Sequence, residues 1–391
     1  MRGTRIMTIG EVCSTISDTY RAKADKVTLI NTSDVLEGKV LNHTQVPNKE
    51  LKGQFKKTFK KNDILYSEIR PQNKRFAFVD FDPVDYIAST KLMVLRADAS
   101  KVLPMYLYFY LKSAPVIAEL QMLAETRSGT FPQITFTELS TLSIPVPSIT
   151  EQEVIVTTIK SIEDKIDCNA DINDNLLQQA KTIFREWFIG NPEKDIWPLV
   201  TLDSLTSLIS RGITPKYADD STQVVLNQKC IRDHYIDTAL ARKHNPKVIN
   251  EKWLQYGDLL INSTGEGTLG RAAQVWFVPE NMTVDSHVTV VRPQNQQLIF
   301  YIGLWGLSHE REFEALHTGS TGQTELPRDR VRDLELRMPD NDILTRFNSV
   351  IEPMVSAIIV NQQENSRLAN IRDTLLPRLT SGEIDVSDIQ L

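Results

Sequence analysis

Three short motifs occur twice in this chain, in the same order and 192 to 195 residues apart. TIGEV (8–12) corresponds to TLDSL (201–205), NDIL (62–65) to GDLL (257–260), and LSIPVP (142–147) to LELRMP (334–339). A long, fixed period indicates two similar modules related by a pseudo-two-fold axis. We therefore expect the whole chain to bind twice whatever one module binds, which makes a bipartite ligand the first functional hypothesis.

Composition places the chain among soluble globular proteins. It has 391 residues, of which 41% are apolar and 24% charged, and this length suits two to three domains. The sequence has neither an apolar stretch of about 18 residues nor a signal-like N-terminus, so we expect a cytoplasmic protein without a membrane partner.

The net charge of −6 is distributed unevenly. Residues 1–150 contain 20 Lys and Arg against 15 Asp and Glu, a net charge of +5, whereas 151–190 and 339–391 carry −4 each and 191–338 carry −3. Because local patches decide phosphate binding, the overall acidity does not exclude nucleic acid as the ligand.

Each copy ends in a segment whose apolar residues repeat with alternating spacings of four and three. The first segment has Ile155, Ile159, Ile162, Ile166, Asn169, Asn173, Leu176, Ala180, Ile183 and Trp187. The second has Phe347, Ile351, Met354, Ile358, Asn361, Asn365, Leu368, Arg372, Leu375 and Leu379. This 3.5-residue repeat is typical of a coiled-coil seam. Each seam covers 33 residues, or roughly 50 Å of helix.

The asparagines in the middle of each seam indicate how the two helices pair. In an antiparallel pair, residues whose numbers sum to 534 face each other, so that Asn169 meets Asn365 and Asn173 meets Asn361. The same register sets Ile162 against Arg372. Buried seam asparagines cost stability and fix register. The alternative is that they are exposed breaks in two surface helices.

Both modules are predicted to be rich in strands. In the first, strands are expected at 61–69, 75–81 and 87–97 and a helix from 104 to about 123. In the second, strands are expected at 257–264, 271–278 and 285–293 and a helix from about 296 to 316. The two modules share the order of elements but differ in their loop sequences. Two domains that recognise different nucleotide sequences would need this combination.

Four loops and one basic run supply candidate DNA contacts. Arginine, lysine and amide side chains suit phosphates and base edges, and small hydroxylated residues beside glycine expose backbone N–H groups. The candidates are Lys56, Lys57, Lys60, Arg70, Gln72, Asn73, Lys74, Arg75, Arg127, Ser128, Thr130, Arg211, Ser263, Thr264, Arg271, Ser320, Thr321 and Gln323. The alternative is that these segments are ordinary solvated turns and a solvated charged face.

The sequence offers no convincing catalytic or metal-binding constellation. Phosphate-loop, GxSxG and HxxxH patterns are missing, and the three cysteines are far apart and expected to be reduced. Gly265, Gly267 and Gly270 spell GxGxxG, but RAAQVWFVP follows where a dinucleotide site needs a helix, so we expect a loop between strands. The ExK triplet at 163–165 lies on an acidic helix and lacks the upstream aspartate of a nuclease site.

The arrangement resembles the specificity subunit of Type I restriction-modification enzymes over essentially the whole chain. The resemblance rests on NDILYSEIRP and GDLLINSTGEGTLGRAA, on SGTFPQITFTELSTLSIPVPSITEQEVIV and LPRDRVRDLELRMPDNDIL, and on the helix ends LLQQAKTIFREWF and LANIRDTLLPRLTSGEI. In that family two target recognition domains each read half of a split DNA sequence, and two helices set the gap. The recognition loops of the family vary, so the resemblance assigns no base-reading residue.

The resemblance implies an α+β fold with two strand-rich recognition domains separated by an antiparallel two-helix coiled coil. The expected parts are recognition domains at 1–149 and 195–339, spacer helices at 150–190 and 340–380, and a tail at 381–391. The implied partners are double-stranded DNA, two copies of a methyltransferase subunit and, in some assemblies, restriction subunits. S-adenosylmethionine and the adenine methylation belong to the methyltransferase, so this chain is expected to be non-catalytic and to need no cofactor.

Two points stay open from the sequence. Phe184, Trp187 and Phe188 either face protein partners or seal the junction between module and helix. The competing functions are a stand-alone bipartite DNA-binding regulator and a scaffold that joins two proteins without DNA.

Overall fold

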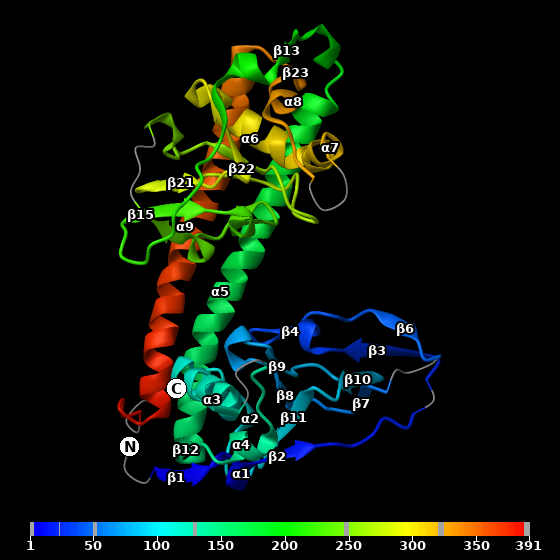
Figure 1. Cartoon of the computed structure of the whole chain (residues 1–391), viewed down its shortest axis with the longest axis vertical. Coiled ribbons are helices and arrows are strands. Elements are labelled where there is room, and N and C mark those ends of the chain that lie inside the picture. Colours follow the sequence, from blue (N-terminus) through cyan, green and yellow to red (C-terminus); the bar gives the residue numbers. More distant parts are fainter. Residues whose placement is uncertain are drawn as a thin grey trace. The chain divides into compact units, whose positions relative to one another are not determined.

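The computed structural model describes residues 4–22, 24–49, 53–127, 131–245, 250–319 and 324–386. These form two compact units: unit 1 comprises Met1–Asp167 with Asn365–Leu391, and unit 2 comprises Cys168–Glu364 (Figure 1). Both units combine sheets with helices, which confirms the predicted α+β class.

Unit 1 contains two four-stranded sheets. Their strand orders are β2-β11-β8-β9 and β6-β3-β10-β7, and a separate antiparallel pair joins β1 to β12. The strands are β1 (Arg5–Thr8), β2 (Cys13–Ile16), β3 (Lys26–Ile30), β4 (Val35–Leu36), β5 (Lys39–Val40), β6 (Gln45–Pro47), β7 (Phe55–Lys57), β8 (Ile64–Ser67), β9 (Phe76–Phe78), β10 (Tyr86–Ser89), β11 (Leu92–Ala97) and β12 (Ser143–Val146).

Unit 2 repeats this architecture. Its sheets have the orders β14-β22-β19-β20 and β18-β15-β21, and β13 pairs with β23 as β1 does with β12. The strands are β13 (Leu199–Thr201), β14 (Thr206–Arg211), β15 (Gln223–Leu226), β16 (Ile231–Arg232), β17 (Tyr235–Ile236), β18 (Arg242–His244), β19 (Leu259–Asn262), β20 (Ala272–Gln274), β21 (Met282–Val284), β22 (Val288–Pro293) and β23 (Glu335–Arg337).

The recurring NDIL and GDLL motifs begin the central strand of each unit. Asn62 and Gly257 have positive φ angles of 71° and 91°, a conformation that favours asparagine and glycine. The next residue is a buried aspartate that binds an arginine of the neighbouring strand: Asp63 with Arg96 in unit 1, and Asp258 with Arg292 in unit 2, both at 2.7 Å. The repeated motif therefore marks the same ion pair in each of the two units.

Two predicted elements are divided in the structure. The strand expected at 87–97 is β10 and β11, which belong to different sheets. The helix expected from 104 is α2 (Pro104–Leu111) and α3 (Ala114–Arg127), because Pro115 lacks the N–H that a continuous helix would use. The helix expected from 296 is likewise divided at His309.

The remaining helices are short, apart from two long ones. The α-helices are α1 (Ile9–Val12), α4 (Phe136–Ser140), α5 (Ile149–Phe184), α6 (Ile299–Ser308), α7 (Glu310–Ala315), α8 (Arg328–Arg332) and α9 (Asn341–Thr380). The 3-10 helices are η1 (Thr32–Asp34), η2 (Pro71–Asn73), η4 (Lys194–Ile196), η5 (Leu202–Leu205), η6 (Gln228–Cys230), η7 (Thr238–Leu240), η8 (Asn250–Lys252) and η9 (Gln296–Leu298), and η3 (Arg185–Ile189) is a π-helical turn.

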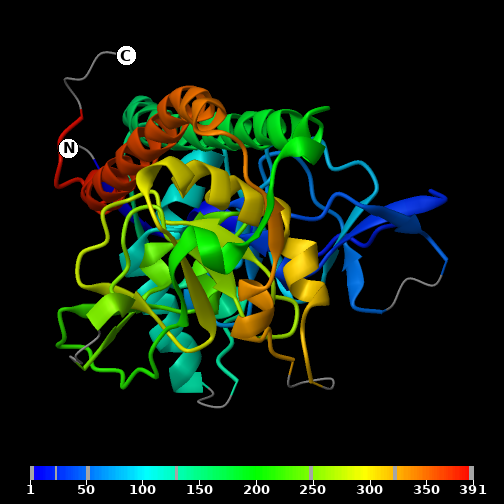
Figure 2. The same cartoon turned by 90° about the horizontal axis from the view of Figure 1, so that it is seen from above.

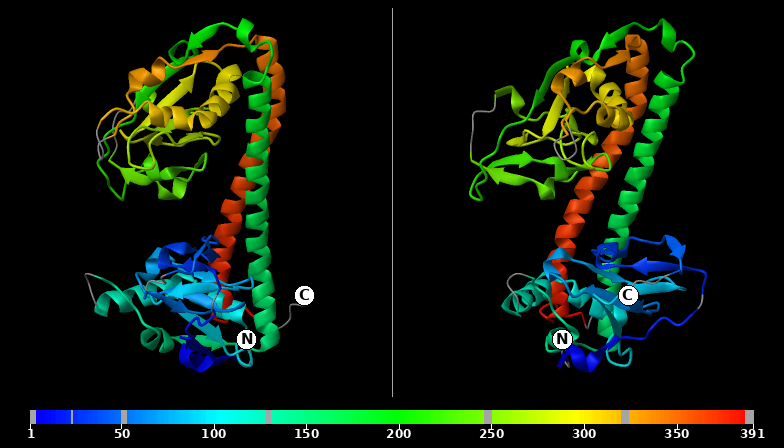
Figure 3. Two further views of the ribbon diagram at one scale, coloured as in Figure 1. Left: turned by 90° about the vertical axis from the view of Figure 1, so that its right-hand side faces the viewer. Right: turned by 45° about the vertical axis from the view of Figure 1, so that its right-hand side comes forward.

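The long helices α5 and α9 each contribute residues to both units and run antiparallel within each (Figure 3). In unit 2, Asn361 donates a hydrogen bond to Asn173 at 2.8 Å and Asn169 donates to Glu364 at 2.7 Å. In unit 1, Asn365 donates to the carbonyl of Ile166 at 3.1 Å. The contact of Asn361 with Asn173 is the pairing that the 534 register predicts.

The buried face of α5 departs from the predicted seam beyond Asn173. Leu177, Phe184 and Phe188 are buried, whereas their neighbours Leu176, Ile183 and Trp187 are only partly buried. In unit 2 this part of α5 packs against both α9 and the module, with α6 between the long helices and the sheet (Figure 2). A helix with two packing partners needs a wider apolar face than a 3.5-residue seam provides.

Among the described residues, α9 is the one helix whose length and composition would allow it to cross a membrane. Its apolar side is occupied within unit 2, where Phe347, Ile351 and Ile358 are buried in the core. One side of α9 is therefore part of the core of unit 2.

Candidate nucleic-acid interface

The turn after β8 in unit 1 presents polar side chains on a fixed backbone. Arg70 and Lys74 have positive φ angles of 43° and 52° on either side of η2. The backbone N–H of Arg70 donates to Pro132 at 3.1 Å, and that of Gln72 donates to the Gln121 side chain at 3.2 Å. Arg70, Gln72, Asn73 and Lys74 are exposed, so the structure leaves these candidates accessible to DNA.

Two candidates of unit 1 are held by the protein itself. Arg75 donates through its guanidinium to the carbonyl of Ser33 at 3.0 Å. Lys57 donates to the carbonyls of Thr90 and Leu92 at 3.1 and 2.8 Å, and burial lowers the pKa of Lys57. Both cations therefore have hydrogen-bond partners within the module, and their role as DNA contacts stays a prediction.

The remaining candidates of the basic run, Lys56 and Lys60, are exposed. Between them Phe59 is buried in the core that underlies β8 and β11. The alternation of lysine and phenylalanine thus comes from one buried ring beneath a charged surface.

Unit 2 corrects one prediction. Ser263 is fully buried and shares a hydrogen bond of 2.6 Å with Thr289, so it is not available to DNA. Arg211 pairs with Glu325 at 2.7 Å and donates to the carbonyl of Leu326 at 2.9 Å. Arg211, Thr264 and Arg271 are partly exposed.

Several candidates lie outside the described residues. They are Ser128, Thr130, Ser320, Thr321, Gln323 and the side chain of Arg127.

The ends of β8 and β19 are joined to two other segments by the same backbone bonds. In unit 1, Glu68 N–H donates to the Lys91 carbonyl at 3.0 Å, and Ile134 N–H donates to the Glu68 carbonyl at 2.9 Å. In unit 2, Ser263 donates to His287 and Leu326 donates to Ser263, each at 2.8 Å. Three chain segments therefore meet in one backbone arrangement at equivalent places.

The side chains at these equivalent places differ in chemistry. In unit 1, Lys91 lies 3.5 Å from the carboxylate of Glu68 and donates to the Gln133 amide oxygen at 3.3 Å. In unit 2, His287 Nδ1 lies 2.8 Å from the hydroxyl of Thr264. A common scaffold thus presents a lysine in one unit and a histidine in the other.

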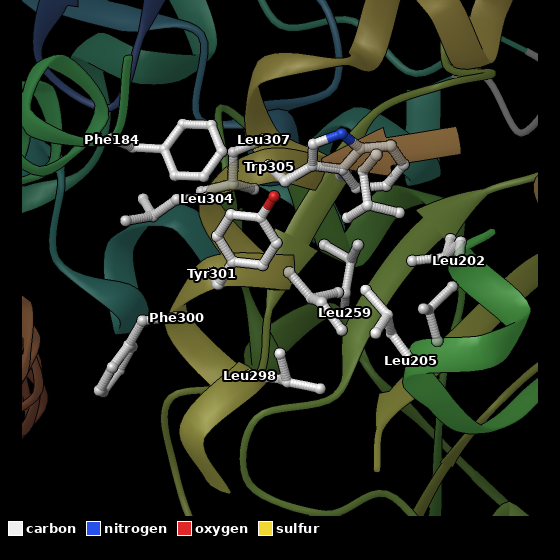
Figure 4. Packing of buried hydrophobic residues seen from close by; sticks show 14 of the residues in the cluster. Phe184, Leu202, Leu205, Leu259, Leu298, Phe300, Tyr301, Leu304, Trp305 and Leu307 are labelled. Carbon is white, nitrogen blue, oxygen red and sulfur yellow. The ribbon is translucent and has the colours of Figure 1, made fainter. Parts of the chain in front are cut away.

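The aromatic residues at the end of α5 are not a partner surface. Phe184 and Phe188 are 1% and 5% exposed, and Trp187 packs against Phe347 with ring centroids 5.9 Å apart. Figure 4 shows the Phe184 ring beside Tyr301 of α6. The structure therefore supports the alternative in which these aromatics seal the junction of module and helix.

The GxGxxG segment is a loop that leads into a strand. Gly265, Gly267 and Gly270 all have positive φ angles, and β20 follows without a helix. The described residues contain no cluster of three or more His, Cys, Asp or Glu that could hold a metal ion. Glu163, the first residue of the ExK triplet, pairs with Lys112 and lies 3.6 Å from Arg372.

Sequence reasoning missed Lys91, Gln228, Arg242 and His287. Lys91 and His287 lie in predicted strands, and Gln228 and Arg242 lie outside every predicted element; in neither place does composition give a sign of function. An offset of 196 pairs Lys91 with His287, since both precede the strand that carries the buried arginine. Comparing residue types across the repeat at this offset would have identified that pair.

Comparison with known proteins agrees with this geometry. Residues 1–178 match the family described as the Type I restriction modification DNA specificity domain. The chain is 28% identical to the HindI specificity subunit of Haemophilus influenzae, covering 96% of this chain and 98% of that protein. It is 27% identical to the MjaIX specificity subunit of Methanocaldococcus jannaschii, covering 78% and 77%.

A solved structure supports the fold independently. The S subunit of a Type I restriction-modification system from M. genitalium aligns over 97% of both chains, with a TM-score of 0.56 at 14% identity. These alignments cover both modules and both long helices, so the similarity extends over both copies of the repeat and is not confined to one domain. The chain is thus similar, over most of its length, to specificity subunits of Type I restriction enzymes.

Proposed function

We propose that this chain is the sequence-reading subunit of a Type I restriction-modification complex and that its two units bind different halves of a split, asymmetric double-stranded DNA target. The observation that carries the proposal is the shared backbone arrangement that presents Lys91 in unit 1 and His287 in unit 2. Backbone contacts position a protein on DNA, whereas side chains at base edges distinguish sequences. Two copies of one scaffold with different side chains would therefore read two different half-sites.

In this proposal α5 and α9 set the gap between the half-sites. Their register within unit 2 depends on the hydrogen bond between Asn361 and Asn173. A polar pair in an apolar helix interface fixes the alignment of the helices, because a shifted alignment would bury each amide without a partner.

The methyl transfer itself is assigned to two copies of a methyltransferase subunit, which would bring S-adenosylmethionine, and restriction subunits complete the assembly. The relatives named above are specificity subunits of Type I restriction enzymes. This chain would supply recognition and no reacting group.

A methyltransferase subunit would dock on the exposed apolar side chains of the long helices. With Phe184 and Phe188 buried, the helix residues of unit 2 that expose large apolar surface include Ile172 and Val360. Isolated apolar residues are common on surfaces, so the assignment needs a matched control. Val360→Asp is expected to lower recovery of the methyltransferase with the chain, whereas Ile196→Asp, a change at a more exposed apolar residue outside α5 and α9, should leave recovery unchanged.

The proposal is tested by mapping methylated bases in DNA from cells that contain or lack this chain, together with its methyltransferase. We expect a split motif with two unlike halves at one spacing, present only with the chain. Methylation without a split motif would overturn the proposal. Tight, sequence-specific binding by the isolated chain, with no methyltransferase co-purifying, would indicate a regulator instead.

A further inference from the structure

Unit 2 contains a polar groove beside the end of β19. Its volume is about 490 Å³, which can accommodate a base edge and its phosphate. The groove is lined by Tyr217, Asn227, Gln228, Lys229, Leu240, Arg242, Asp285 and His287.

A network of hydrogen bonds orients the ring of His287. The amide nitrogen of Gln228 donates to the hydroxyl oxygen of Thr264, and that oxygen lies 2.8 Å from Nδ1 of His287. The same hydroxyl thus contacts both the Gln228 amide and the imidazole, which fixes the direction in which the ring points. Nε2, the other ring nitrogen, is left to bind a ligand.

Neighbouring residues hold the side chains of this hydrogen-bond network in place. The hydroxyl of Thr268 donates to the amide oxygen of Gln228 at 3.4 Å, which orients the amide. Gly265 has a φ of 99°, and a Cβ there would lie 2.6 Å from the same oxygen. The backbone N–H of His287 donates to the buried carboxylate of Asp285 at 2.9 Å. Glycine is thus required for the close approach, and His287 is fixed at both its backbone and its ring.

The lining of the groove also carries positive charge. The guanidinium of Arg242 lies 3.4 Å from the ring centroid of Tyr217, a stacking contact that holds the charge in one orientation. Lys229, also exposed, lines the same groove. A groove that contains both a fixed cation and an oriented imidazole suits a phosphate together with a base edge.

We propose that His287 is a specificity-determining residue for the second half-site, where its Nε2 forms a hydrogen bond with an atom on a base edge, while Arg242 binds the adjacent phosphate. The proposal rests on the function proposed above and deepens it by naming the reading group of unit 2. Thr264 and Gln228 are positioning residues that act through the ring of His287. Lys91 is the equivalent residue in unit 1, and its charge would give the first half-site a different preference.

The experiment uses the assembled complex of this chain with its methyltransferase and maps the methylated motif for four chains: wild type, His287→Ala, Thr264→Val and Lys91→Ala. We expect His287→Ala to reduce discrimination at one base position of one half-site by about 10- to 100-fold, with the other half-site and the gap unchanged. Thr264→Val should relax the same position less, because the ring remains but loses the hydrogen bond that orients it. Lys91→Ala should relax a position in the other half-site.

Three results separate this proposal from the function on which it rests. An unchanged motif for His287→Ala, in a complex that assembles like wild type, overturns the role of His287. Relaxation of the same half-site by His287→Ala and Lys91→Ala overturns the assignment of one reader to each unit. A wild-type complex that methylates no split motif overturns the proposed function, and the role of His287 with it.

Discussion

Units 1 and 2 share their buried interactions more closely than their exposed ones. Each has an aspartate that binds an arginine of the adjacent strand, and each joins three segments through matching backbone bonds. At the surface above those bonds, Lys91 in one unit is replaced by His287 in the other. The comparison shows that the buried ion pair and backbone ladder maintain the scaffold, so the exposed positions can change without loss of the fold.

The two buried ion pairs should differ in strength. Arg292 is 11% exposed and also donates to the carbonyls of Glu251 and Trp253, whereas Arg96 is 29% exposed. Arg292→Met leaves Asp258 buried without its partner and should cost about 3 to 5 kcal/mol of unfolding free energy. Arg96→Met should cost less, because water can reach the site.

Fluorescence can separate the two effects in the intact chain. All five tryptophans lie between residues 187 and 305, within unit 2. In urea unfolding, Arg292→Met should lower the midpoint of the transition that is followed by tryptophan fluorescence. Arg96→Met should lower only the midpoint of a transition that is followed by circular dichroism. Equal losses from both variants would contradict the difference in burial.

Removing one seam asparagine should have a smaller effect. Asn361→Ala leaves the nearly buried amide of Asn173 without its hydrogen bond and is expected to cost about 1 to 3 kcal/mol in the tryptophan-detected transition. The adjacent exposed change Val360→Ala is the control and should alter stability by less than about 0.5 kcal/mol. A stable Asn361→Ala variant would show that register does not depend on this pair.

Unit 2 should lose stability in mild acid because of His234. Burial lowers the pKa of His234, against the opposing effect of Glu310, and Lys181 Nζ lies 3.0 Å from its Nε2. The unfolded state therefore binds the proton more tightly, so stability is complete above the ordinary histidine pKa of 6.5 and falls as pH drops below it.

The decline can be at most about 1.4 kcal/mol per pH unit for this one group. Tryptophan-detected urea unfolding at several pH values would measure it, with His234→Gln as the comparison. His317→Gln, at an exposed position of the same unit, should keep the wild-type pH dependence. An identical slope in His234→Gln would exclude His234 as the source.

The smallest effect concerns the thiols, one buried in each unit. Burial raises the pKa of Cys13 to about 12 and also raises that of Cys230, whereas Cys168 is exposed. Iodoacetamide should modify Cys168 alone in the native chain and all three thiols after unfolding in urea, as mass spectrometry would detect. Fast native labelling of Cys13 or Cys230 would reveal local opening of that unit.

Much of the fold could be predicted because its signals are periodic. The repeated motifs located two modules, and the asparagines of the long helices predicted the contact of Asn361 with Asn173. The face of α5 beyond Asn173 could not be predicted from a 3.5-residue repeat, because the buried positions there depend on the module that covers them. The parallel pairing of β3 with β10 and of β15 with β21 joins segments far apart in sequence.

The candidate site was harder to predict than the fold. The loops around Arg70 and Thr264 were located correctly, but composition could not distinguish exposed Arg70 from Arg75 or Lys57, whose partners are backbone carbonyls. Such partners have no sequence signature, because every residue carries a carbonyl group. Ser263 was predicted to be a DNA contact in a loop, but it is fully buried at the end of β19, where the sequence does not show which loop residues face the core.

Unit 1 is built from two separate parts of the chain, and this fixes the order in which the two units can finish folding during synthesis. Its core includes Leu376, Leu379 and Val386, and the hydroxyl of Tyr106 donates to the carbonyl of Thr380 at 3.3 Å. Unit 2 is continuous and lies between the two parts of unit 1 in the chain. A ribosome therefore releases every residue of unit 2 before unit 1 can close its core, so the module that begins first finishes folding last.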